Sequence, residues 1–132
     1  MGDKRKVVVV IDEEDTNTIY LQKLEKAGFD VLHFKKVSDG VSRLRELSGC
    51  EVLLVLDVML PPEEYPGNGI DTGLLAYRDI RAEFPFLPII VFTLRRDVTK
   101  PMLDSRDENV EVLNKLRTAP KDLLDATSRM IK

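Results

Sequence analysis

The chain is organised around one apolar stretch that ends in a carboxylate. Residues 51–56 read EVLLVL, which is the length and composition of a strand buried on both faces. Such strands belong to parallel sheets that helices cover on both sides. Asp57 follows directly, at the carboxyl end of the strand, where open α/β sheets bind their ligands. Two interpretations of Asp57 remain open here: a functional carboxylate, or a loop cap of the kind that aspartate commonly forms.

Length and composition favour one globular domain. The 132 residues suit a single core, so we expect one domain over residues 1–132. No apolar run approaches the roughly 20 residues that cross a bilayer, and the N-terminus has no secretory pattern, which predicts a cytoplasmic protein without membrane contact. A formal net charge of -3 with mixed signs predicts no direct contact with nucleic acid. The single cysteine, Cys50, excludes an internal disulfide, and we expect it to pack beside the third strand.

Strand and helix patterns alternate along the chain. We expect strands over residues 6–11, 30–34, 51–56, 88–93 and 109–114. We expect helices over about 16–27, from an N-cap at Ser38 to Gly49, over about 72–83, as a short segment within 97–104, and from Pro120 onward. Five such units with right-handed crossovers predict an α/β fold, a flavodoxin-like (βα)5 doubly wound parallel sheet in three layers. Its strand order is 2-1-3-4-5.

This strand order places acidic residues from two strands at one edge of the sheet. Asp12 and Glu13 follow the first strand and Asp57 follows the third, on either side of the switch point of the fold. Carboxylates about 4 Å apart repel one another by about 1 to 4 kcal/mol per pair. A divalent cation offsets this repulsion most simply, and an all-oxygen site with room for water suits Mg²⁺ better than zinc.

Thr93 and Lys115 complete the predicted site. Thr93 ends the fourth strand with a hydroxyl, and Lys115 follows the fifth strand with a mobile positive charge. Together with the carboxylates and a metal ion, they would neutralise a tetrahedral dianion attached to Asp57.

These residues together resemble the receiver domain of bacterial response regulators, the CheY-like family. The resemblance covers nearly the whole chain and is carried by the acidic pair at 12–13, Asp57 followed by Pro61, the sequence TGLL at 72–75, Thr93 and Lys115. Each motif is weak alone, but all five occur in order at the ends of predicted strands or at the start of a helix.

The resemblance implies a role for each site residue. Asp57 would be the phosphoacceptor for a histidine kinase or a histidine phosphotransfer protein, in a signalling domain with at most slow self-dephosphorylation. The Mg²⁺ ligands would be Asp12, Glu13, Asp57 and the backbone carbonyl of Met59. Thr93 and Lys115 would bind the phosphoryl oxygens and report their presence to an output domain or partner through the face formed by the fourth helix, fifth strand and fifth helix. The expected state is a monomer or weak dimer.

The chain departs from the family pattern in the segment after Asp57. Gly73 stands twelve residues after Pro61, a longer spacing than the family uses. We expect residues 62–71 to form a surface loop beside the site. Either it tunes access and partner choice, or it is a tolerated loop without a role.

Three single positions depart as well. Leu94 replaces the usual small residue after the threonine, and Leu116 replaces the usual proline after the lysine. Val112 stands where many receivers carry a switching aromatic side chain, which argues against the usual coupling between threonine and aromatic residue.

The acidic pair has two alignments. Reading Asp12 and Glu13 as the pair requires a first helix one residue shorter than usual, whereas the usual helix length aligns Ile11 and Asp12 with the two acids. We favour the first alignment, because Ile11 completes an apolar strand. Asp12 belongs to the site in both.

The sequence leaves two functional classes other than the phosphoacceptor to compare. A degenerate receiver would have the same fold and act as a protein interaction module without phosphorylation. An aspartate-nucleophile phosphatase would need a second aspartate two residues after its nucleophile, but Met59 stands two residues after Asp57. The only histidine, His33, falls on a predicted strand, which favours a structural role over a phosphorelay role.

Overall fold

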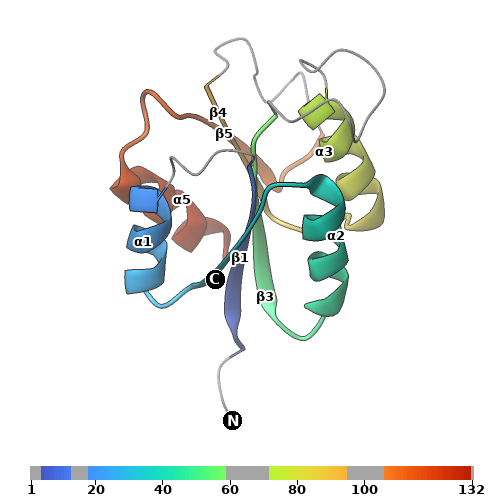
Figure 1. Ribbon diagram of the computed structural model, residues 1–132, viewed down its shortest axis with the longest axis horizontal. Helices are drawn as coiled ribbons and strands as arrows, with labels where there is room; N and C mark the ends of the chain where they lie inside the picture. The colour runs from blue at the N-terminus through green and yellow to red at the C-terminus, as the bar shows by residue number, and fades with distance from the viewer. Residues whose placement is uncertain (1–3, 13–17, 59–71, 95–105, 132) are drawn as a thin grey trace.

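The computed structural model describes residues 4–12, 18–58, 72–94 and 106–131 (Figure 1). The strands are β1 (Lys6–Ile11), β2 (Asp30–Phe34), β3 (Glu51–Leu56), β4 (Ile89–Thr93) and β5 (Val110–Asn114), and the helices are α1 (Thr18–Lys26), α2 (Val37–Glu46), α3 (Thr72–Glu83) and α5 (Pro120–Met130). The short helix predicted within 97–104 and the loop predicted at 62–71 lie outside the described residues.

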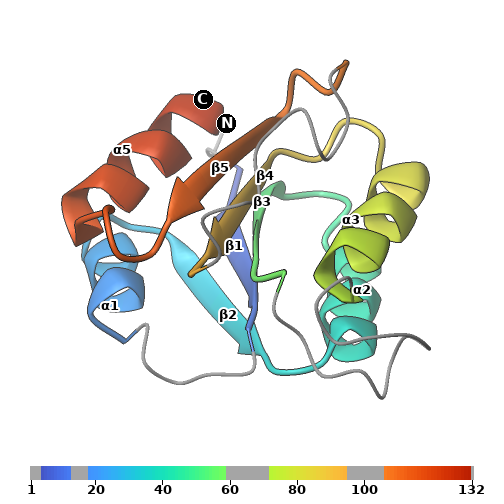
Figure 2. The ribbon, with the colours of Figure 1, turned by 90° about the horizontal axis from the view of Figure 1, so that it is seen from above.

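All five strands are parallel and lie in the order β2-β1-β3-β4-β5. Helices α1 and α5 cover one face of the sheet, and α2 and α3 cover the other, as Figure 2 shows from above. The predicted flavodoxin-like fold and its strand order are therefore confirmed. None of the helices in the described part of the chain is long and apolar enough to span a membrane.

The central strands are buried on both faces, as their unbroken apolar composition predicts. Along β1, Val7, Val9 and Ile11 belong to the core under α2 and α3, whereas Val8 and Val10 belong to the core under α1 and α5. Side chains of a strand point alternately to its two faces, so two hydrophobic cores sandwich the sheet.

The register between β1 and β3 decides the position of the site. Ile11 pairs with Leu56, and the Asp57 amide donates to the Ile11 carbonyl at 3.0 Å. The residues that follow the two strands, Asp12 and Asp57, therefore leave the sheet at the same level.

The start of α2 differs from the prediction. Lys36, not Ser38, occupies the N-cap position, and it makes no capping hydrogen bond with its side chain. The helix begins at Val37, whose side chain is buried in the core, so Ser38 already lies in the first turn. Burial of the apolar side chain determines where this helix begins, against the capping preference of serine.

The other boundaries agree with the prediction to within a residue or two. Gly28 adopts a φ of 102° directly after α1, a conformation that favours glycine and ends the helix there. Pro120 opens α5, and the Asp122 carboxylate accepts a hydrogen bond of 2.9 Å from the Ala119 amide. Strand β4 begins at Ile89 because Pro88 has no amide hydrogen and contributes only its carbonyl, which accepts from the Leu54 amide.

Candidate functional site

Three charged side chains from distant parts of the chain meet at the carboxyl ends of β1, β3 and β5. The Lys115 ammonium donates to Asp12 Oδ2 at 2.6 Å and to Asp57 Oδ2 at 2.8 Å. All three side chains are buried, with 8% of Lys115, 3% of Asp12 and 6% of Asp57 exposed to solvent. We call Asp12, Asp57 and Lys115 the carboxylate cluster.

Backbone hydrogen bonds hold the cluster in place. The Asp12 amide donates to the Phe34 carbonyl of β2 at 3.0 Å, and the Lys115 amide donates to the Thr93 carbonyl at 2.9 Å. Thr93 is fully buried at the end of β4 and pairs with Asn114 of β5. The sheet therefore brings the backbone of Thr93 beside Lys115, as the strand order predicts.

Aromatic side chains support the lysine from the side of α1. The Lys115 ammonium lies 5.7 Å from the centre of the Phe92 ring, and the Tyr20 ring packs edge-on against Phe92. The Tyr20 hydroxyl donates to the Thr118 carbonyl at 2.5 Å, which ties α1 to the segment after β5. This aromatic support was not predicted from the sequence, because it joins side chains from different elements.

The two carboxylates decide the charge of Lys115. Burial by itself lowers the pKa of the Lys115 ammonium, but hydrogen bonds to Asp12 and Asp57 and the attraction of their charges outweigh burial, so the pKa is raised above its ordinary value. The ammonium is therefore charged at neutral pH. The same ammonium thus serves both carboxylates.

Two of the four predicted metal ligands, Asp12 and Asp57, lie in the carboxylate cluster. Glu13 and Met59 lie outside the described residues, and within the described ranges no group of three or more histidine, cysteine or acidic side chains is close enough to hold a metal. Asp12 and Asp57 offer hard oxygen donors from two carboxylates. This donor set fits Mg²⁺, which proteins commonly hold through one or two carboxylates while the ion keeps several waters.

The structure also places the residues that depart from the family pattern. Leu94 is 41% exposed just beyond Thr93, and Leu116 is 67% exposed just beyond Lys115. Val112 of β5 is partly buried against the core under α2 and α3. Ile11 is fully buried in that core and leaves Asp12 as the first acid after β1.

His33 is a neighbour of the site. The sequence predicted only a structural role for it. It lies on β2 as predicted, and its ring nitrogen Nε2 donates to the Asp12 backbone carbonyl at 2.7 Å. The signal was present in the strand order, which puts β2 beside β1, but a contact between side chain and backbone cannot be read from order alone.

A second buried set of charges lies at the amino ends of β4 and β5. The Asp107 carboxylate accepts from the Tyr77 hydroxyl, from Arg81 Nε at 2.9 Å and from the Asn109 amide at 2.9 Å. Burial and the bond to Asp107 raise the pKa of Tyr77 to about 12. We call Tyr77, Arg81 and Asp107 the arginine cluster.

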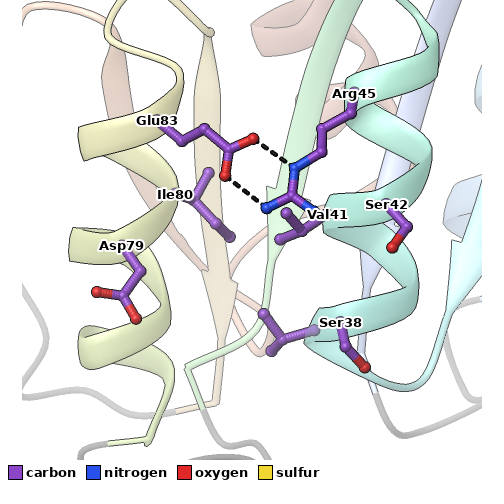
Figure 3. A pocket seen from close by; sticks show the side chains of 8 residues that line it. Ser38, Val41, Ser42, Arg45, Asp79, Ile80 and Glu83 are labelled. Atoms are coloured by element: carbon purple, nitrogen blue, oxygen red, sulfur yellow. Dashed lines mark hydrogen bonds and ion pairs between the residues drawn. The ribbon is translucent and has the colours of Figure 1, made fainter.

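A groove of about 400 Å³ lies between α2 and α3 (Figure 3). Arg45 of α2 and Glu83 of α3 close it with two hydrogen bonds of 2.6 and 2.8 Å. Its remaining lining is mixed: Val37, Ser38, Val41, Ser42, Asp79 and Ile80. The two charges of the ion pair satisfy each other, and Asp79 is the remaining ionisable residue of the lining. The groove therefore offers no arrangement for acid, base or metal chemistry comparable with the carboxylate cluster.

Comparison with known proteins agrees with the fold. No protein-family model matches the chain. The alkaline phosphatase synthesis transcriptional regulatory protein PhoP of Bacillus subtilis is 32% identical over 92 residues, which are 69% of this chain and 34% of that protein. The chain thus spans about a third of the length of the curated relative it matches.

Solved receiver structures superpose on almost the whole chain. A response regulator receiver domain protein from Clostridium thermocellum has a TM-score of 0.73 at 23% identity, over 96% of this chain and 94% of its own. A response regulator from Thermotoga maritima has a TM-score of 0.72 at 24% identity, over 96% and 98%. The Vibrio cholerae chemotaxis protein CheY4 has a TM-score of 0.74 at 18% identity, over 96% and 98%. Fold and sequence together identify the chain as a receiver domain of the response regulator, CheY-like type.

Proposed function

We propose that this receiver domain accepts a phosphoryl group on Asp57, from a histidine kinase or a histidine phosphotransfer protein, with Mg²⁺ bound beside it. The proposal rests on one observation: the buried side chains of Asp57 and Asp12 both pair with Lys115 at the carboxyl edge of the sheet. Two carboxylates that share one ammonium form an acceptor, a metal ligand and a counter-charge within one site.

The chain's own residues account for the transfer. A carboxylate oxygen of Asp57 attacks phosphorus, the bond from phosphorus to the donor's leaving group breaks, and an acyl phosphate forms. Bound Mg²⁺ would supply positive charge to the phosphoryl oxygens, with Asp12, Glu13, Asp57 and the Met59 carbonyl as its ligands. Lys115 can turn from Asp57 Oδ2 to a phosphoryl oxygen, since its ammonium carries three donors.

Thr93 would supply the second contact to the phosphoryl group. It stands at the end of β4, next to the strand that carries Asp57, and its backbone is fixed to Lys115. We place the protein in the cytoplasm, where its kinase partners would meet it. An output domain or partner protein would bind the face that includes β5 and α5.

The direct test is labelling by acetyl phosphate, followed by intact-protein mass. Wild-type protein with Mg²⁺ should gain the mass of one phosphoryl group, and removal of Mg²⁺ by a chelator should prevent it. Asp57→Asn should gain nothing, because an amide is a poor nucleophile. Asp79→Asn is the matched control, because it removes an exposed carboxylate from α3, and it should be labelled like the wild type. Full labelling of Asp57→Asn would refute the proposal.

One observation favours the degenerate receiver as a second candidate. Lys115 engages both carboxylates, and Asp57 is only 5% exposed, so a phosphodonor must displace existing contacts. A wild-type protein that stays unlabelled with acetyl phosphate, and whose metal titration shows no response to Mg²⁺ with or without beryllofluoride, would support this candidate.

A further inference from the structure

We propose that His33 is a positioning residue that fixes the Asp12 backbone and thereby strengthens cation binding at the carboxylate cluster. The proposal rests on the Mg²⁺ site of the proposed function. Asp12 is held on both sides by β2: its amide donates to the Phe34 carbonyl at 3.0 Å, and its carbonyl accepts from His33 Nε2 at 2.7 Å.

The direction of the His33 bond is fixed by chemistry. A carbonyl oxygen only accepts hydrogen bonds, so Nε2 must carry a proton and act as the donor. This requirement is met by one neutral tautomer and by the charged ring alike, so the contact does not depend on the charge of His33. The bonded Nε2 also leaves that nitrogen unsuited to accept a phosphoryl group.

The bonds on either side of Asp12 restrain its carboxylate. Fixing the amide and the carbonyl of one residue sets both of its peptide planes, and these determine the direction in which its side chain leaves the backbone. The Asp12 carboxylate then points to the Lys115 ammonium at 2.6 Å, on the edge shared with Asp57. Residues that orient metal ligands through hydrogen bonds typically change metal affinity by roughly 10-fold to 100-fold when they are replaced.

The test is a direct cation titration of the intact chain without any phosphodonor, with Mn²⁺ as the probe and water-proton relaxation as the readout, and competition by Mg²⁺. His33→Leu removes the donor and should weaken the affinity about 10-fold. His33→Gln keeps an N–H donor at a similar distance from the backbone and should stay within about 2-fold of the wild type.

Val31→Ala is the matched control. Val31 lies two residues before His33 and packs in the core under α1 and α5, but it pairs with Val8 rather than lying beside Asp12. Its truncation should lower the melting temperature without changing the cation affinity. A purely structural role of His33 predicts the same pattern for His33→Leu as for Val31→Ala.

The outcomes separate this inference from the proposed function. If the folded His33→Leu variant binds the cation as tightly as the wild type, the role of His33 is overturned and the phosphoacceptor site is unaffected. Equal weakening by His33→Leu and His33→Gln would also overturn it, since the donor would not be the cause. A wild-type protein that binds neither cation would overturn both.

Discussion

The two buried clusters lie at opposite ends of the sheet and differ in how their charges are arranged. In the carboxylate cluster, two aspartates share one lysine ammonium. In the arginine cluster, Asp107 faces Arg81 and receives two further hydrogen bonds, from the Tyr77 hydroxyl and the Asn109 amide. Arg81 also donates to the Phe84, Leu87 and Asn109 carbonyls.

This difference distinguishes a site from a structural contact. A buried carboxylate that is paired with a cation and accepts from several donors needs no further ligand. The contacts of Asp107 join α3 to the segment before β5. A pair of carboxylates with one shared cation is destabilised by its own repulsion and gains from any added positive charge. The comparison therefore predicts that mutations in the arginine cluster change stability but not ligand binding, whereas mutations in the carboxylate cluster change ligand binding.

The largest effect on stability is expected for Arg81→Leu. The change leaves Asp107 buried without its cation, and removing one partner of a buried ion pair costs about 3 kcal/mol or more of unfolding free energy. Urea denaturation measures the loss. The folded variant should still be labelled on Asp57, because the arginine cluster lies at the far end of the sheet.

Arg45→Met is the matched control for Arg81→Leu. Arg45 also pairs with an acid across two elements, but 59% of its side chain and 39% of Glu83 are exposed. Exposed ion pairs contribute less than about 1 kcal/mol. Equal losses for the two arginine variants would contradict the distinction between a buried and an exposed pair.

Lys115→Ala should lower the unfolding free energy in chelator by about 2 kcal/mol, because it leaves two buried carboxylates facing each other. In the folded wild type, the pKa of Lys115 is raised above its ordinary value. The stability that Lys115 contributes is therefore complete below the ordinary lysine pKa and is lost only as the pH rises through the raised value. The deficit of the variant therefore exists at neutral pH.

Two further measurements sharpen the Lys115 result. Mg²⁺ should restore more stability to Lys115→Ala than to the wild type, since no ammonium competes for the carboxylates, and much of the Asp57 labelling should remain. Lys121→Ala, on the exposed start of α5, is the control and should stay within about 0.5 kcal/mol of the wild type. A Mg²⁺ response in Lys115→Ala no larger than that of the wild type would break the comparison between the clusters.

Asp107→Asn should lower the unfolding free energy by about 1.5 kcal/mol at neutral pH, the scale of a hydrogen bond to a charged group. Burial tends to raise the pKa of Asp107, but the bonds from Tyr77, Asn109 and Arg81 outweigh it, so the pKa is lowered from 3.8. Stability from such a group is complete above the ordinary pKa and is lost as the pH falls through the lowered value. The gap between wild type and variant should therefore be constant near neutral pH and shrink below 3.8. A gap that widens in acid would contradict this assignment.

The sequence predicted the sheet and its order well, for a physical reason. Strands such as β1 and β3 are continuous apolar runs that can be stable only between two helical layers, and the alternation of elements then fixes the order. The range of α3 was also predicted, and its Tyr77 and Ile80 side chains are buried. The start of α2 was predicted wrongly, because burial of Val37 outweighs the capping preference of Ser38.

The site was predictable only where backbone order was enough. Asp12, Asp57 and Lys115 follow strands whose ends meet at one edge, so their proximity follows from the fold. The bond from His33 to the Asp12 carbonyl and the pairing of Arg81 with Asp107 depend on side-chain reach across elements, which no periodicity encodes. Glu13 and Met59 remain predictions from the resemblance.

Mg²⁺-linked stability tests the account most directly, because one measurement addresses both clusters. At ten times the dissociation constant, a cation that binds only the folded state adds about 1.4 kcal/mol to the unfolding free energy. Urea denaturation with and without Mg²⁺ should show this gain in the wild type and the same gain in Asp107→Asn, which starts from a lower stability. Asp57→Asn should lose most of the gain. An equal Mg²⁺ gain in the wild type and in Asp57→Asn, or none in the wild type, would contradict the account.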